Sequence, residues 1–152
     1  MKNLNLIKNE NFCEYLQNNK ECNFTINVEK EITFGEEIVI PKGEYRFCVT
    51  KEDEDEWLVC KYSGKYEMYR EPIGKVTKIC NRFYYTRRLG LTAELKFLDH
   101  PFILLGLLNN EINDLASVKV YKHIRCKYCR TWVRAVSSIK REAGPCCYRK
   151  NS

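Results

Sequence analysis

The chain has 152 residues, of which 44% are hydrophobic and 30% are charged. These proportions are typical of a globular protein with one domain and a small appendage at most, and they argue against a disordered, collagen-like or membrane-spanning chain. The formal net charge of +6 is unevenly distributed. Residues 119–150 hold ten Lys and Arg against one acid, Glu142, and carry +9, whereas residues 1–118 carry −3. The basic segment also holds the densest group of cysteines.

The cysteine content bears on the compartment. The nine cysteines are an odd number, and no apolar run precedes them in residues 1–11. We therefore expect no secretory signal and a reducing cytoplasm, where clustered cysteines more often bind metal than form disulfides. The longest apolar stretch, residues 101–108, is far shorter than the roughly 20 residues that cross a bilayer, so we expect no membrane contact.

Apolar spacing predicts the elements of the first half of the chain. Helix-like spacing over residues 12–16 predicts a short helix, and alternation from Phe24 through Ile26 to Val28 predicts a strand. Further β-rich runs follow at residues 32–34, 38–40, 44–50 and 57–62. The acidic run 51–56 between two of them is either a solvated turn or a mimic of DNA phosphates.

Residues 74–85 predict one or two more strands, rich in Val, Ile, Phe and Tyr. Within them begins a basic and aromatic cluster, residues 81–88. It is either a strand that sends Phe83 and Tyr85 into the core and Arg82 and Tyr84 to water, or a binding platform.

The pattern becomes helical after Leu89. Asp99 can cap a helix over residues 101–112 with Pro101 in its first turn, and its apolar face is expected to hold Phe102, Leu105 and Leu108 or Ile112. Residues 117–124 predict a last strand, in which Val118, Val120 and Ile124 face one way. The fold class expected is α+β, with a β-rich body over residues 1–116 and a small zinc-finger-like C-terminal module over residues 117–152.

The cysteine spacing in the basic segment predicts a metal site. Two thiolates in a C-x-x-C turn, Cys126 and Cys129, can reach one ion, and Cys146 and Cys147 follow sixteen residues later. Such spacings are typical of zinc, with unpaired buried thiols as the alternative. We predict a structural Zn²⁺ held by Cys126, Cys129 and Cys147, with Cys146 favoured over His123 as the fourth ligand.

The surroundings of these cysteines favour a structural ion over a catalytic one. Four basic residues are expected to lower the thiol pKa values: Arg125, Lys127, Arg130 and Arg149. No metalloprotease or deaminase motif accompanies the cysteines, so we expect no enzyme. Ser137 or Ser138 is expected to cap a short helix that Gly144 and Pro145 end. The other cysteines are expected to act as small buried hydrophobes; these are Cys13, Cys22, Cys48, Cys60 and Cys80.

The C-terminal residues resemble a family of small phage and prophage proteins of unassigned function. Its signature has the form C-x-x-C, then S-I, then G-P-x-C, and here it stands as residues 126–129, Ser138-Ile139 and Gly144-Pro145-Cys146-Cys147. The family's upstream Pro-x-Gly-x-Tyr turn and Asp-Pro helix start correspond to residues 41–45 and 99–101. Arg130 stands where the family has glycine.

This resemblance implies a small protein that acts by binding in the cytoplasm of a host bacterial cell. The function expected first is an anti-CRISPR-like inhibitor that docks on a host effector nuclease and blocks DNA loading. The alternative is direct nucleic-acid binding by the basic module, with Tyr128, Trp132 and Tyr148 stacking on bases, unless that surface is only solvated and Trp132 packs on the module. The residues expected to bind are Arg125, Lys127, Arg130, Trp132, Arg134, Lys140, Arg141 and Arg149.

Overall fold

A computed structural model describes residues 5–34, 38–63, 69–87 and 100–151. Its elements are β1 (Leu6–Ile7), η1 (Asn9–Asn11), α1 (Phe12–Asn18), β2 (Glu21–Val28), β3 (Ile32–Phe34), β4 (Ile38–Ile40), β5 (Gly43–Asp53), β6 (Glu56–Ser63), β7 (Tyr69–Ile79), β8 (Arg82–Arg87), α3 (His100–Leu108), η3 (Leu115–Ser117), β9 (Val118–Lys122), β10 (Ile124–Arg125), β11 (Trp132–Val133), α4 (Val136–Arg141) and α5 (Pro145–Asn151). The predicted fold class, a β-rich α+β body followed by a C-terminal cysteine cluster, is confirmed.

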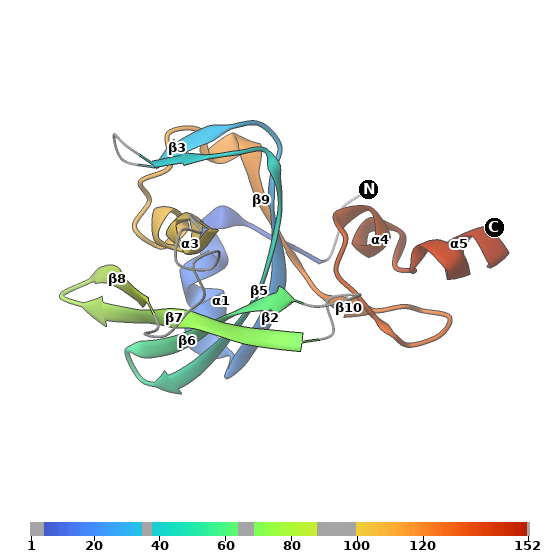
Figure 1. Ribbon diagram of the computed structural model, residues 1–152, viewed down its shortest axis with the longest axis horizontal. Helices are drawn as coiled ribbons and strands as arrows, with labels where there is room; N and C mark the ends of the chain where they lie inside the picture. Colours follow the sequence, from blue (N-terminus) through green and yellow to red (C-terminus); the bar gives the residue numbers. More distant parts are fainter. Residues whose placement is uncertain (1–4, 35–37, 64–68, 88–99, 152) are drawn as a thin grey trace.

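Seven strands form one antiparallel sheet in the order β1-β9-β2-β5-β6-β7-β8. The predicted alternation of β2 is confirmed, because Phe24, Ile26 and Val28 are all buried in the main core. Figure 1 shows α1 and α3 lying together within the curve of this sheet. Trp57 on β6 links the sheet to α1, since its indole N–H donates a hydrogen bond to the carbonyl of Leu16 at 3.1 Å.

Helix α3 is buried on nearly all sides. We predicted an amphipathic helix over residues 101–112, but the observed helix ends at Leu108 and buries Ile103, Leu104 and Leu107 as well as Leu105. A helix enclosed by a curved sheet and a neighbouring helix has no solvated face, so no apolar stripe marks its sequence. It ends early because Asn110 takes a left-handed conformation and the Glu111 amide closes onto the Gly106 carbonyl at 2.9 Å. Asp99, the predicted cap, lies outside the described residues.

The β5–β6 and β7–β8 hairpins bear on three predictions. The acidic run lies at the exposed tip of the β5–β6 hairpin, as a solvated turn requires, and the alternative, a mimic of DNA phosphates, stays a prediction. In β8, Phe83 is buried and Tyr84 is exposed, as the core-strand reading predicts. Cys80 is exposed in the turn between β7 and β8, so its predicted burial is wrong. Its positive φ of 51° beside that of Asn81 at 65° marks a tight hairpin turn, which holds the side chain away from the sheet.

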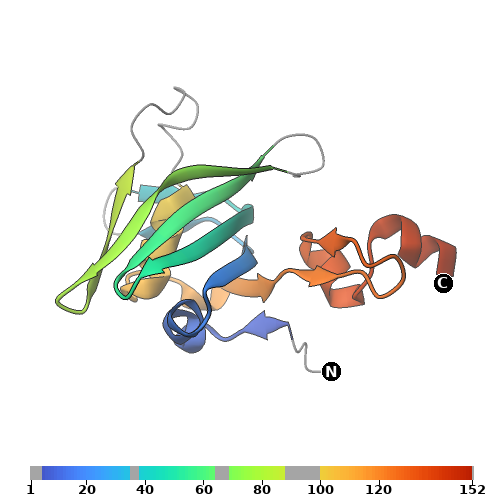
Figure 2. The ribbon, with the colours of Figure 1, turned by 90° about the horizontal axis from the view of Figure 1, so that it is seen from below.

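The C-terminal module, residues 123–151, projects from one end of the sheet, as Figure 2 shows in orange and red. Strand β9 pairs with β1 and β2 inside the sheet, although its residues fall within the predicted C-terminal range 117–152. Val118 and Val120 face the main core as predicted, but Ile124 belongs to β10 and packs in the module. The chain therefore passes from sheet to module without a linker, and the predicted two-domain division stays a prediction. Among the described helices, none has the length and apolarity to cross a membrane.

Candidate metal centre

The module has a small core of its own. The β10–β11 hairpin, α4 and α5 pack around six buried residues. Tyr121 comes from β9 of the sheet, and the other five belong to the module: Cys126, Val133, Val136, Ile139 and Ala143. The predicted helix caps are wrong in detail. Helix α4 starts after Ala135 and ends at Glu142 in a left-handed conformation, while Ser138 is buried within it. Pro145 opens α5 rather than closing α4, because a proline is tolerated in the first turn of a helix, and α5 carries Cys147.

The turn that holds Cys126 and Cys129 is fixed by backbone hydrogen bonds. The amide of Cys126 donates to the carbonyl of Thr131 at 2.7 Å, and the amide of Arg130 donates to the carbonyl of Cys126 at 2.9 Å. Arg130 has a φ of 65°, in the left-handed region that glycine adopts most readily. An arginine therefore takes a backbone conformation that is more common for glycine, and the turn forms with a non-glycine residue at this position.

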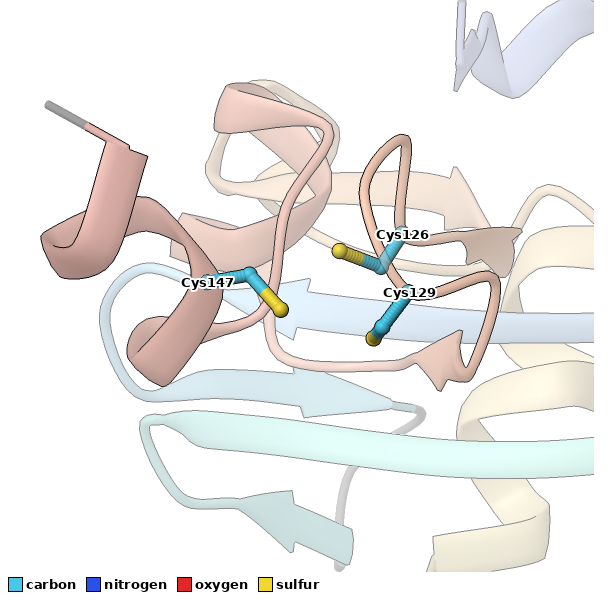
Figure 3. Close-up of side chains that lie close together, drawn as sticks. All are labelled: Cys126, Cys129 and Cys147. Atoms are coloured by element: carbon cyan, nitrogen blue, oxygen red, sulfur yellow. The ribbon is translucent and has the colours of Figure 1, made fainter.

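The structure brings three of the predicted ligands together. The sulfur atoms of Cys126, Cys129 and Cys147 all lie within 4.8 Å of one another, and Figure 3 shows the three side chains converging from the turn and from α5. In a tetrahedral zinc–thiolate site with bonds of about 2.3 Å, the sulfurs are about 3.8 Å apart. The observed group therefore needs a contraction of at most about 1 Å, and it can hold a metal ion.

The electrostatics favour the thiolate, the form that binds metal, at two of the three cysteines. Backbone amides, first that of Cys129 and then those of Gly144 and Tyr128, lower the pKa of Cys126 to about 6. A hydrogen bond with the Thr131 hydroxyl lowers the pKa of Cys129. The pKa of Cys147 is raised to about 11, mainly by its hydrogen bond to Cys129. The predicted effect of the basic side chains is not among these causes, so the turn itself prepares the thiolates.

The fourth predicted ligand has two candidates. The side chain of Cys146 lies outside the described residues. His123 does not join the described ligand group. It is buried against the sheet instead, where its Nε2 lies 2.8 Å from the hydroxyl of Thr25. Burial, then the nearby Arg134 and Arg46, lowers the pKa of His123 to about 3.

The module is fastened to the sheet by polar contacts. The hydroxyl of Thr25 on β2 donates to the carbonyl of Arg134 at 2.6 Å, and a carboxylate oxygen of Glu44 on β5 accepts from the amide of Val136 at 3.0 Å. A pocket lies at this junction. The module residues Arg125, Trp132 and Arg134 line it, as does His123. Sequence reasoning missed the residues of the sheet that complete it, which are Glu21, Asn23, Tyr62 and Arg70.

The other predicted binding residues lie elsewhere on the module. Lys127 and Arg130 are exposed at the cysteine turn. Lys140 and Arg141 occupy the last turn of α4, and Arg149 occupies that of α5. The structure thus brings together only three of the eight predicted binding residues in one pocket and distributes the others over the module surface.

Comparison with known proteins adds no relative: no family, characterised protein or solved structure matches this chain.

Proposed function

We propose that the three-cysteine group holds a structural zinc ion. Three thiolates, one with a pKa near 6, are ligands that zinc prefers over hard cations. The ion would join the turn to α5 and add folding free energy to a module with a small buried core. Cys126, Cys129 and Cys147 would hold it, and Cys146 is the proposed fourth ligand.

Metal analysis and chelation test this part. Purified protein should contain about one zinc per chain. An excess of chelator should lower the melting temperature and reduce the near-UV circular dichroism that the aromatic residues of the folded module give. Because Cys147 donates to the other thiols, zinc uptake should also release protons. A metal content far below one per chain would remove the zinc proposal.

We further propose that the module binds single-stranded nucleic acid without catalysing a reaction. The observation that carries this is three exposed aromatic rings, each paired with a cation. Tyr128, Trp132 and Tyr148 are 45%, 46% and 42% exposed. Lys127 lies 5.4 Å from the ring centre of Tyr128, Arg125 lies 4.5 Å from that of Trp132, and Arg141 lies 4.4 Å from that of Tyr148.

Such pairs offer the two interactions that a single strand needs, because bases stack on open rings while cations neutralise the adjacent phosphates. The +9 charge of residues 119–150 adds long-range attraction. The partner of this surface is therefore proposed to be a flexible polyanion with aromatic bases.

A binding titration over salt concentration tests this function. Affinity for a short single strand should fall by about tenfold or more between 50 and 200 mM salt, and Trp132→Ala should weaken binding by about 5- to 100-fold. Tyr84→Ala is the matched control, since Tyr84 is equally exposed but lies on β8 of the body. Salt-independent binding, or equal losses for both variants, would contradict the proposal.

The anti-CRISPR-like inhibitor stays a prediction. A pulldown from a bacterial lysate, with and without nuclease treatment, separates the two functions. If an effector nuclease is still recovered after nuclease treatment, the result favours the inhibitor. If proteins are recovered only while nucleic acid is intact, the result favours nucleic-acid binding by the module.

A further inference from the structure

The pocket at the junction of sheet and module has the size of a small-ligand site. Its volume is about 390 Å³, near the lower end of the roughly 300–1,000 Å³ typical of such sites. Neither half of the molecule forms it alone. Tyr62 and Arg70 come from β6 and β7 of the sheet, whereas Arg125 and Trp132 come from the β10–β11 hairpin.

The pocket is cationic. Three guanidinium groups line it, those of Arg70, Arg125 and Arg134, against one carboxylate, that of Glu21. Glu21 is already engaged, since it pairs with Arg70 and accepts a hydrogen bond from Asn23 at 3.3 Å. The charge that remains uncompensated within the lining is therefore that of Arg125 and Arg134, which suits an anion.

Aromatic rings hold these two arginines in place. The guanidinium of Arg134 lies 4.3 Å from the ring centre of Tyr62, and that of Arg125 lies over Trp132. Arg125 also donates to the carbonyl of Arg130 at 3.0 Å. Guanidiniums that are already oriented lose less side-chain entropy when an anion arrives. Trp132 remains half exposed beside them and offers a stacking surface.

Two buried polar atoms of the pocket lining have no hydrogen-bond partner among the described residues: Nδ1 of His123 and Nε of Arg134. The tautomer of His123 follows from its neighbour. Because the single hydroxyl proton of Thr25 goes to the carbonyl of Arg134, Nε2 of His123 must carry a proton and donate to Thr25. Nδ1 is then a hydrogen-bond acceptor, in a side chain that is only 8% exposed.

The lining therefore combines charged donors with one acceptor that neighbouring atoms cover, so a ligand group reaches Nδ1 of His123 only when that cover moves aside. A phosphate diester alone satisfies the donors but offers no proton to Nδ1 of His123. The 2′-hydroxyl of a ribose can donate such a proton, whereas a deoxyribose has no hydroxyl at that position.

We propose that this pocket binds a ribonucleotide unit, with its phosphate on Arg125 and Arg134, its base against Trp132 and its 2′-hydroxyl donating to Nδ1 of His123. The inference rests on the proposed nucleic-acid function and gives it a preference for RNA over DNA. The unit is either a free mononucleotide or one residue of an RNA strand, because both carry the phosphate, base and 2′-hydroxyl that the pocket would contact.

Calorimetric titration of the metal-loaded full chain tests the pocket. The probes are AMP, dAMP and inorganic phosphate, together with a single-stranded RNA and a DNA of the same short sequence. The ribose form of each pair should bind about 3- to 10-fold more tightly, because one hydrogen bond to a buried acceptor is gained. Binding of AMP itself would identify a free nucleotide as a ligand; discrimination seen only with strands would identify a residue of RNA.

Variants separate the parts of the site. Arg134→Gln and Arg125→Gln should each weaken the ribose form by about tenfold or more, the loss expected for one charge-assisted hydrogen bond. His123→Gln keeps a donor toward Thr25 and should abolish the ribose preference while retaining phosphate binding. Lys122→Gln is the matched control, because Lys122 is an exposed cation of the same basic segment outside the pocket.

Two results would overturn the proposal that the pocket binds a ribonucleotide. Equal affinity for ribose and deoxyribose forms would do so, and so would equal losses for the arginine variants and Lys122→Gln. If strands bind with strong salt dependence but without sugar discrimination, the proposed function stands and the pocket assignment falls. If AMP binds in preference to dAMP but strands do not bind, the pocket stands and the proposed strand-binding function falls.

Discussion

His123 should make the junction of sheet and module sensitive to acid. Its pKa in the folded protein is about 3, against an ordinary value of 6.5, because burial and two nearby arginines disfavour the charged ring. Since the folded-state value is the lower one, the unfolded chain binds the proton more readily between pH 6.5 and 3, and acid favours unfolding. Stability contributed by the neutral ring is complete above pH 6.5 and is lost as the pH falls.

The magnitude follows from this shift. Each pH unit below 6.5 costs about 1.4 kcal/mol of unfolding free energy, so lowering the pH from 7 to 5 costs about 2 kcal/mol. For a chain of this size that corresponds to a fall of about 4 to 8 °C in melting temperature. The thiols of the metal centre also respond to acid, so the wild-type curve alone does not isolate His123.

The assay is therefore a comparison of two curves of melting temperature against pH. His123→Gln removes the titrating ring and retains a donor for Thr25. Both proteins carry the same cysteines, and the difference between the curves reports His123 alone. The wild type should lose about 2 kcal/mol more than the variant between pH 7 and 5. Parallel curves would refute the reasoning, whatever the absolute stability of the variant.

Three further predictions concern the backbone and the metal. Arg130→Val should cost about 1–2 kcal/mol, because a β-branched residue is strained at a φ of 65°, whereas Arg130→Gly should cost nothing; equal melting temperatures for both variants would contradict this. Gly74→Ala should destabilise the sheet by about 1–3 kcal/mol, since its Cβ would overlap the carbonyl of Thr86 and the ring of Tyr85, and urea unfolding measures the loss. Cys126→Ser should lower the zinc content to well below one per chain, while Cys80→Ser, which changes an exposed hairpin thiol, should leave it unchanged.

Local patterns allowed most of the strands and the cysteine turn to be predicted. Over residues 24–28 apolar residues alternate with the polar Thr25 and Asn27, and this alternation predicts the strand although Thr25 is itself buried under the module. The C-x-x-C spacing of Cys126 and Cys129 predicts a turn that brings both sulfurs to one place. The limits of α3 could not be found in this way. Because α3 is buried on nearly all sides, its sequence lacks the alternation of apolar and polar residues that marks a helix, and its end depends on the left-handed conformation of Asn110.

The junction pocket was beyond sequence reasoning for a different reason. Arg70 and Tyr62 lie on the body's strands and have no motif that associates them with Arg125 or Trp132. Their meeting depends on the register of β6 with β7 and on the way β9 enters the module. Nothing local in the sequence specifies these long-range pairings, whereas the charge concentrated in residues 119–150 can be read from the sequence alone.

The proposed metal centre and the proposed pocket share one hairpin, so their binding equilibria should be coupled. Arg125 precedes the ligand Cys126 directly, and Trp132 pairs with Arg125 across the strands that the cysteine turn connects. An ion that orders this turn therefore also orders two walls of the pocket. By thermodynamic reciprocity, a pocket ligand should raise zinc affinity by the factor by which zinc raises ligand affinity. Zinc titrations against a competing chelator, with and without saturating AMP, measure that factor; identical zinc affinities would show that the pocket forms independently of the ion.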